Sequence, residues 1–314
     1  MAILGLDIGG TKILGALFNK KGIIIDKEKK ASRAEDGQEV FLNQVYKVID
    51  NLLERSDDKV KGIGIGFPGI VDAKGFVVFA PNLPIKKYDL AADLRKRYGV
   101  EVRIGNDVNM GTFGEYKELQ IDFKNVIGIF PGTGLGGGII IDGDLYIGQG
   151  FAGELGHIVV QRDGVQCSCG NYGCLESYAS KKGIISYILN QEKRGRVSTL
   201  LDDAYSGVVK SSKLRKACDE KDPVVIDAME QFVDYLGMGI GSVINVFNPD
   251  LVIVGGGIID SFGDELLEDI KKHTKAHSMT GMYKNTKIEK SKLGDDAVIY
   301  GAYHLVKAHI KKNK

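Results

Sequence analysis

The chain opens with short apolar runs that turn residues separate. Residues 2–8, 13–18 and 22–25 are mostly apolar, and Gly9-Gly10-Thr11 and residues 19–21 lie between them. Runs of this kind, bounded by glycine and polar residues, are typical of strands joined by hairpin turns. The pattern therefore predicts a three-stranded antiparallel meander.

Helical spacing follows the meander. Residues 39–53 place apolar side chains three and four positions apart, which predicts an amphipathic helix. A strand at 62–67, a helix at 90–98 and a strand at 101–104 are predicted next. Asn106-Asp107 then stands where a side chain can cap a helix that runs to about residue 119.

The pattern of strand, glycine turn and strand recurs in the second part of the chain. The recurring unit comprises a strand at 126–130, a glycine loop at 132–138, a strand at 139–141, the turn Asp142-Gly143 and a strand at 145–147. Asp222-Pro223 then opens a long helix to about residue 247, because Asp can cap it and Pro suits its first position. A short strand at 251–254 and a last helix at 297–309 complete an α/β pattern with two similar halves.

Composition and charge narrow the class of protein. The 314 residues are 43% hydrophobic and 26% charged, which is ordinary for a globular protein and long enough for two domains. Lys plus Arg number 42 against 41 for Asp plus Glu, so no net field favours nucleic acid or a membrane surface. No apolar run approaches a membrane span, and the amino terminus lacks a secretion-signal pattern. We expect a cytoplasmic protein with a small polar ligand.

Glycine is the one unusual count, with 42 residues, and it gathers in three clusters after predicted strands. Backbone without side chains can turn N–H groups toward phosphate oxygens, although an ordinary tight turn remains the alternative for each cluster. The second cluster matches G-x-G-x-x-G, but a strand follows it where a dinucleotide site needs a helix, and no Walker motif is present. The predicted cofactor-binding residues of these clusters are Gly9, Gly10, Thr11, Lys12, Gly132, Thr133, Gly134, Gly136, Gly137, Gly256 and Gly257. Asp7, beside the first cluster, is placed to hold Mg²⁺ through water, or else to cap a turn.

Three of the four cysteines stand close together, and His157 precedes them by ten residues. Cys167, Cys169, Cys174 and His157 make a Cys₃His set, the composition of a closed structural zinc site, which leaves no position for catalysis. Unliganded structural thiols are the alternative. Cys218 stands apart and is expected to be inert.

Several polar side chains are interleaved with these clusters. Asn106-Asp107, Glu154, His157 and Glu176 could bind the hydroxyls of a sugar, and one carboxylate could accept a hydroxyl proton during phosphoryl transfer. Taken singly, each carboxylate could equally be a helix cap or a surface charge. Their position among glycine loops and metal ligands favours a functional site.

At this point the chain resembles the ROK family of sugar kinases and repressors, within the actin-like ATPase superfamily. The similarity spans nearly the whole chain. Its most specific parts are the residues 167–176, Glu154-Leu155-Gly156-His157 and residues 7–12.

The resemblance implies two α/β domains of the actin-like ATPase (ribonuclease H-like) fold with a cleft between them. Residues 1–110 would form a small domain that the last helix, about 297–314, completes, and residues 111–296 a large domain with the zinc site. ATP would lie between them, with Gly256 and Gly257 near the adenosine. Asp107 would be the general base on the sugar 6-hydroxyl, and the sugar ligands would be Asn82, Asn106, Asp107, Glu154, His157 and Glu176. His157 would give one ring nitrogen to zinc and the other to the sugar.

The implied activity is ATP-dependent phosphorylation of a hexose at the 6-hydroxyl, with Mg²⁺ and a structural Zn²⁺, and glucose as the expected sugar. A kinase for N-acetylmannosamine, N-acetylglucosamine, mannose or fructose is the alternative, and a non-catalytic sugar sensor is a remote one. Repressor members of the family carry a DNA-binding domain before the first phosphate loop, where this sequence has only residues 1–6. We therefore expect no nucleic-acid partner. We expect the protein to form a homodimer.

Overall fold

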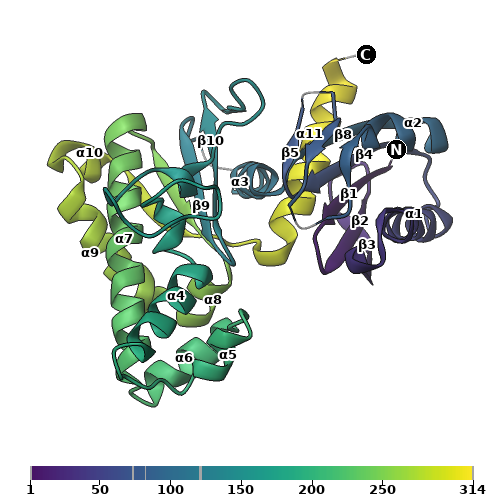
Figure 1. Cartoon of the computed structure of the whole chain (residues 1–314). Helices are drawn as coiled ribbons and strands as arrows, with labels where there is room; N and C mark the ends of the chain where they lie inside the picture. Colours follow the sequence, from purple (N-terminus) through teal and green to yellow (C-terminus); the bar gives the residue numbers. More distant parts are fainter. Residues whose placement is uncertain (1, 73, 82, 120–121, 313–314) are drawn as a thin grey trace.

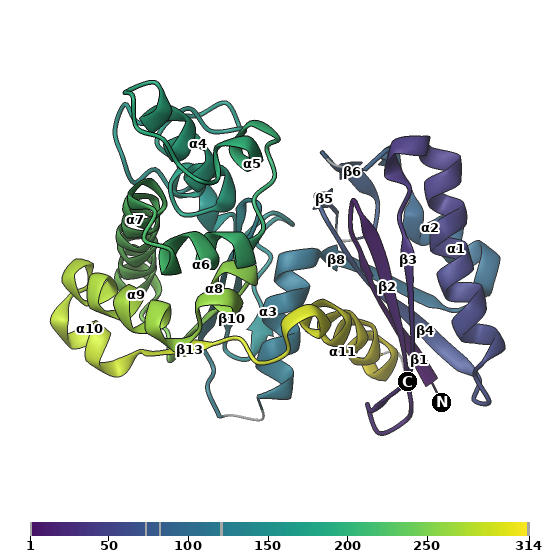
Figure 2. The same cartoon turned by 90° about the horizontal axis from the view of Figure 1, so that it is seen from below.

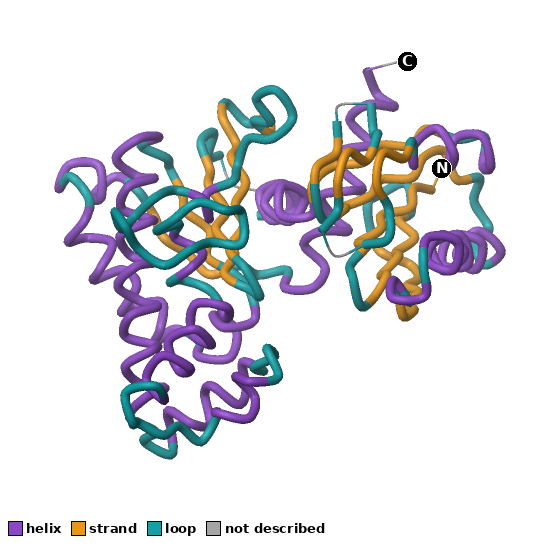
Figure 3. Tube along the Cα trace, viewed as in Figure 1, coloured by secondary structure: helices purple, strands orange, loops and turns teal. Residues whose placement is uncertain are grey.

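Two five-stranded sheets, each covered by helices, make up the protein (Figure 1). The computed structural model describes residues 2–72, 74–81, 83–119 and 122–312. Figure 3 shows the two groups of strands on either side of a central pair of helices. No helix in these described ranges is long and apolar enough to cross a membrane.

The first sheet has the strand order β3-β2-β1-β4-β8. Its strands are β1 (Ala2–Ile8), β2 (Lys12–Phe18), β3 (Ile24–Ala31), β4 (Val60–Phe67) and β8 (Glu101–Asn106). The strands β1 to β3 are antiparallel, and β1, β4 and β8 are parallel. Helices α1 (Gln38–Glu54) and α2 (Leu90–Tyr98) pack on one face, and α11 (Ala297–Lys312) on the other. A small sheet of β5 (Ile70–Val71), β6 (Val77–Phe79) and β7 (Lys86–Tyr88) adjoins it.

The second sheet repeats this arrangement in the order β11-β10-β9-β12-β13. Its strands are β9 (Val126–Pro131), β10 (Leu135–Ile141), β11 (Asp144–Leu145), β12 (Leu251–Val254) and β13 (Lys287–Lys290). Again a meander precedes two parallel strands, which confirms the predicted repeat. The helices of this half are α4 (Lys181–Glu192), α5 (Leu201–Tyr205), α6 (Ser211–Asp219), α7 (Pro223–Phe247), α8 (Gly257–Phe262), α9 (Asp264–His277) and α10 (Thr280–Asn285).

Two predicted elements were misplaced. The third strand is β3 (Ile24–Ala31) and not residues 22–25, because this edge strand alternates exposed and half-buried positions and carries mostly charged side chains, so apolar content could not reveal it. The glycine loop at 132–138 was too long, because β10 already begins at Leu135. The glycines that follow Leu135 are strand residues in close contact with α3 (Asp107–Glu118) and with the short helix Leu155–His157.

Helices α3 and α11 cross between the two sheets (Figure 2). The two helices approach closely because each has a glycine at the contact. A Cβ on Gly114 would come within 2.0 Å of the Ala297 carbonyl oxygen, and one on Gly301 within 1.9 Å of the Met110 carbonyl oxygen. Part of the high glycine content therefore serves helix packing and not ligand binding.

A buried carboxylate fixes the segment that leads into α11. Glu115 of α3 is 1% exposed. It accepts hydrogen bonds from Ser291 Oγ at 2.5 Å and from the backbone N–H groups of Lys292 and Leu293 at 3.0 and 2.8 Å. The connection between β13 and α11 is thus attached to α3, which itself packs against both sheets.

Gly301→Ala should destabilise the protein, because the added Cβ would force α3 and α11 apart. Overpacking of this kind costs roughly 1–3 kcal/mol, so thermal unfolding should occur several degrees lower. The control is Gly281→Ala in α10, where a Cβ would meet nothing within 4 Å. Ala is the better helix former, so the control should unfold at an equal or higher temperature. Equal melting temperatures for Gly301→Ala and the wild type would contradict the close crossing.

Candidate functional site

The parallel strands of the first sheet bring Asp7 and Asp107 to the same edge. Asp7 pairs with Gly66 of β4, and Gly66 pairs with Gly105 of β8, two residues before Asp107. Asp107 is the first residue of α3, and its Oδ1 accepts a 2.9 Å hydrogen bond from the Val108 N–H. The two carboxyl groups therefore share the edge from which α3 starts.

Both carboxyl groups have raised pKa values. Burial, with the negative charges of Asp107 and Asp295, raises the pKa of Asp7 to about 7, although Lys12 acts in the opposite direction. Burial also raises the pKa of Asp107, against the hydrogen bonds from the backbone N–H groups of Val108 and of Asp107 itself, and the charge of Glu154 adds to the rise. A raised pKa makes a carboxylate a stronger base, which suits a group that accepts a proton.

Asn106 and Asn82 are the predicted sugar ligands nearest to Asp107 in the sequence. Asn106 caps α3, as expected, because its Oδ1 accepts from the N–H groups of Val108 and Asn109 at 3.0 and 3.1 Å. Its Nδ2 lies 3.4 Å from the Gly69 carbonyl oxygen. Asn82 lies outside the described residues.

A pocket of about 430 Å³ opens between the two halves beside Asn106. Residues of β8, α3 and α11 line one side, and Leu145, Ile147 and Gly150 of the second half line the other. Among the described sugar-ligand candidates it includes only Asn106, so it borders the site and is not its centre.

His157 faces both a thiol and a carboxylate. Its Nδ1 lies 3.7 Å from Cys167 Sγ, and its Nε2 lies 3.8 Å from Glu154 Oε2. One ring nitrogen can therefore bind a metal while the other stays beside Glu154, a predicted sugar ligand. A metal on one nitrogen would fix the tautomer and the direction of the other.

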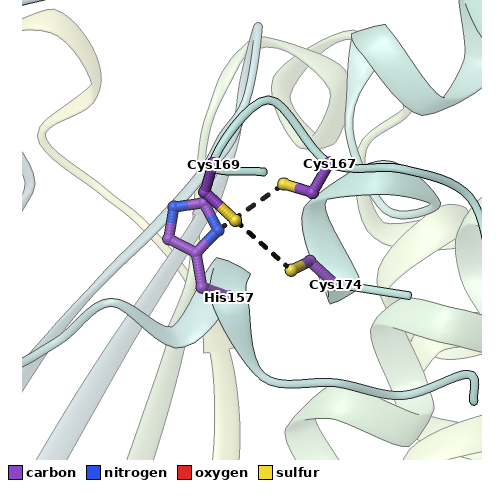
Figure 4. Close-up of side chains that lie close together, drawn as sticks. All are labelled: His157, Cys167, Cys169 and Cys174. Carbon is purple, nitrogen blue, oxygen red and sulfur yellow. Dashed lines mark hydrogen bonds between the residues drawn. The ribbon is translucent and has the colours of Figure 1, made fainter. Parts of the chain in front are cut away.

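The three cysteines converge on His157 (Figure 4). The Sγ atoms of Cys169 and Cys174 are 3.7 Å apart, and all four potential ligand atoms lie within 4.8 Å of one another. Sulfur ligands about 2.3 Å from a tetrahedral zinc would be about 3.8 Å apart. The 3.7 Å between Cys169 and Cys174 matches this separation, so the geometry fits a Cys₃His zinc ion.

The thiols differ in acidity. Burial raises the pKa of Cys174 to about 12, and its neighbouring cysteines add to the rise. Burial acts in the same direction on Cys167, but hydrogen bonds from the backbone and side chain of Cys169 outweigh it and lower the pKa to about 7. Three adjacent thiolates repel one another, so a divalent cation would supply the charge that lets all three ionise.

Glu176 connects the cysteine segment to the second glycine cluster. Its Oε2 accepts a 2.8 Å hydrogen bond from the Leu135 N–H, and its Oε1 accepts from Ser168 Oγ at 3.3 Å. A Cβ on Gly134 would lie 2.1 Å from the same Oε2. The sequence indicated Glu176 only as a sugar ligand, and nothing in its spacing revealed this contact with a predicted phosphate loop.

The glycine clusters take different positions. The turn between β1 and β2 consists of Gly9, Gly10 and Thr11, and Lys12 begins β2. The Gly9 N–H donates to the Lys12 carbonyl oxygen at 2.9 Å. Gly132, Thr133 and Gly134 form the loop between β9 and β10, whereas Gly136 and Gly137 lie inside β10. The third cluster adjoins this loop, because a Cβ on Gly256 would lie 2.4 Å from the Pro131 carbonyl oxygen. Gly257 begins α8.

Asp295 is a residue that the sequence analysis did not select. Its Oδ2 lies 2.5 Å from Lys12 Nζ, so the segment before α11 forms an ion pair with the turn between β1 and β2. Its charge also helps to raise the pKa of Asp7. The acidic pair Asp295-Asp296 just before the last predicted helix was the available signal, but helix starts commonly carry acidic residues without any such role.

Comparison with known proteins finds one matching family and relatives of two kinds, kinases and repressors. A model of the ROK family matches residues 3–309. The chain is 33% identical over 312 residues to a glucokinase from Halalkalibacterium halodurans, covering 97% of this chain and 94% of the relative. It is 32% identical over 315 residues to a xylose repressor from Caldicellulosiruptor bescii, covering 97% and 78%. A crystal structure of a ROK family glucokinase from Streptomyces griseus, in complex with glucose and AMPPNP, is similar with a TM-score of 0.80 and 32% identity, covering 97% and 99%.

Gly134→Ala should weaken sugar binding, because the new Cβ would displace the Glu176 carboxylate. Loss of hydrogen bonds to a charged group predicts a glucose affinity lower by about 10- to 100-fold. Gly132→Ala is the matched control, because a Cβ there meets no protein atom within 4 Å; it should leave glucose affinity unchanged. Calorimetric titration with glucose measures both, and an unchanged affinity in Gly134→Ala would contradict the role of Glu176.

Cys169→Ser should lose zinc and bind glucose more weakly, because the metal would no longer orient His157. Metal analysis should find less than one zinc per chain, thermal unfolding should occur at a lower temperature, and binding of a non-hydrolysable ATP analogue should change less than binding of glucose. Cys218→Ser is the control, because Cys218 lies outside the Cys₃His cluster. A zinc-free variant with wild-type glucose affinity would refute the coupling of metal and sugar.

Proposed function

This chain belongs to the ROK family, and we propose that it transfers the γ-phosphoryl group of ATP to the 6-hydroxyl of a hexose, with glucose as the preferred sugar. Its fold is the two-domain α/β fold of the actin-like ATPases. The observation that carries the proposal is the position of Asp107. Its carboxyl group has a raised pKa, lies at the start of α3 and is close enough to Glu154 and Asp7 for their charges to interact.

The proposed mechanism assigns each step of proton and phosphoryl movement to a group. The Asp107 carboxylate accepts the proton of the 6-hydroxyl as that oxygen attacks the γ-phosphorus, the bond from the γ-phosphorus to the β,γ-bridging oxygen breaks, and ADP leaves. The sugar hydroxyls are held by Asn82, Asn106, Glu154, His157 and Glu176. Backbone N–H groups of the loops at 9–12 and 132–134 hold the phosphates. Asp7 would hold Mg²⁺, which would supply positive charge to neutralise the phosphate oxygens.

The boundaries of the two domains are also part of the proposal. Residues 1–110 with α11 would form the small domain and residues 111–296 the large one, since the two sheets divide at α3. Closure of the domains over the sugar would exclude water. A structural zinc at the Cys₃His set, a homodimer and a cytoplasmic location complete the proposed enzyme.

Two alternatives predict different outcomes. The first alternative is a kinase for another hexose or hexosamine. The glucokinases among the relatives support glucose, but the residues that would bind hydroxyls suit several hexoses. The xylose repressor among the relatives favours the second alternative, a sugar-binding protein that does not turn over ATP. Asp7 and Asp107, which share one edge of the first sheet, favour catalysis.

An assay of ADP release tests the proposal directly. Purified protein with Mg²⁺ and ATP is supplied with glucose, mannose, fructose, N-acetylglucosamine or N-acetylmannosamine, and glucose should give the highest kcat/KM. Faster turnover of another sugar would replace glucose and leave the kinase reaction in place. If calorimetry detects hexose binding but no sugar is phosphorylated, the protein is a sensor and the proposed function is wrong.

Asp107→Asn should lower kcat by about 10² to 10⁴, the usual contribution of a general base. The fold should persist, because an Asn Oδ1 can still accept the hydrogen bond from the Val108 N–H. Sugar and ATP-analogue affinities, measured by calorimetry, should change little. Asp122→Asn is the control for the same substitution at an exposed position, and near-normal turnover in Asp107→Asn would exclude Asp107 as the base.

A further inference from the structure

Lys181 lies where the second and third glycine clusters meet. It is the first residue of α4, and its backbone N–H donates to the Gly132 carbonyl oxygen at 3.0 Å. Its Nζ lies 4.0 Å from the position that a Cβ on Gly257 would occupy. The residue therefore contacts one predicted phosphate loop through its backbone and reaches the other cluster with its ammonium group.

The ammonium group of Lys181 has no counter-charge in the part of the chain that the structure describes, where it makes neither an ion pair nor a hydrogen bond. The side chain is partly buried, and burial lowers the pKa of this lysine. Its place is unfavourable for a cation in a second way, because the first turn of a helix carries partial positive charge. An unpaired cation in such a place costs stability, so its presence indicates an anionic ligand.

A second polar group with no partner faces the same point. Ser211 is the first residue of α6 and is 8% exposed, and its Oγ has no hydrogen-bond partner among the described residues. This Oγ lies 3.3 Å from the Cβ position of Gly257. The side chains of the first residues of α4 and α6 thus both reach the position beside Gly257. The first backbone N–H groups of α4 already donate to the glycine loop and to Ser180. The donors that this corner offers to a phosphate are therefore the Lys181 ammonium group and the Ser211 hydroxyl.

We propose that Lys181 binds the phosphate chain of ATP, and that Ser211 supplies a second donor at the same corner. The inference rests on the proposed kinase function and adds to it a cationic residue outside the glycine clusters. Lys181 would supply a positive charge from the second half of the protein.

The test is calorimetric titration of Lys181→Met with ADP in the presence of Mg²⁺. Met keeps the length of the side chain and removes its charge. Loss of a hydrogen bond between charged groups should weaken ADP binding by about 10- to 100-fold, whereas binding of glucose should stay as in the wild type. Without nucleotide, the variant should melt at the same temperature as the wild type or higher, because the unpaired cation has been removed. Adenosine, which has no phosphate, should bind the variant and the wild type equally.

Lys182→Met is the matched control. Lys182 is the next residue of α4, its side chain is exposed, and its backbone N–H also donates to the glycine loop, at the Thr133 carbonyl oxygen. It should bind ADP as the wild type does. Ser211→Ala should weaken ADP binding to a smaller extent, because it removes a neutral donor and leaves the cation in place.

The outcomes separate the two proposals. If the wild type binds ADP and Lys181→Met binds it equally well, the assignment of Lys181 is wrong while the kinase function stands. An equal loss of ADP affinity in Lys182→Met would also refute it, because a general effect on α4 would then explain both. If the wild type binds ADP but phosphorylates no hexose, the kinase function is wrong, and the comparison of the two variants still decides the role of Lys181.

Discussion

The close crossing of α3 and α11 is the contact on which the rest of the structure depends. Gly114 and Gly301 let the two backbones approach, and the buried carboxylate of Glu115 holds the segment that leads into α11. A buried carboxylate without partners would cost several kcal/mol, so these hydrogen bonds tie that segment firmly to α3. Because Asp107 begins α3, the crossing also sets the position of the proposed base relative to both sheets.

A second set of contacts joins the proposed metal, sugar and nucleotide sites. His157 lies between Cys167 and Glu154, and Glu176 lies between Ser168 and the Leu135 N–H. The proposed sugar ligand His157 therefore also contacts the proposed metal site, and the proposed sugar ligand Glu176 also contacts the second glycine cluster. In such an arrangement a substitution in one site changes affinity in another, and the energies of paired substitutions do not add.

Local signals in the sequence were sufficient for much of the fold. The Asp222-Pro223 cap, the helix to Phe247 and the β12 strand are present as predicted, because each depends on residues within one short segment. The repeat of the meander was also predicted, although the bounds of several of its strands differ. The edge strand β3 was missed because its side chains are mostly charged. The Glu115 contacts and the bond from Leu135 to Glu176 were not predictable, because they join residues that are distant in sequence. The same reason hid Lys181, since a lysine at a helix start has no local pattern that distinguishes it.

The position of α11 has a consequence for how the protein is made. This helix comes last in the chain, yet it covers the face of the first sheet that carries Ile3, Leu14 and Phe18. During synthesis that apolar face is made long before α11, so it stays uncovered until α11 follows. Contacts of such long separation close slowly, and exposed apolar sheet surface favours aggregation in the meantime. A chaperone would therefore be of most use while the first sheet has been made and α11 has not.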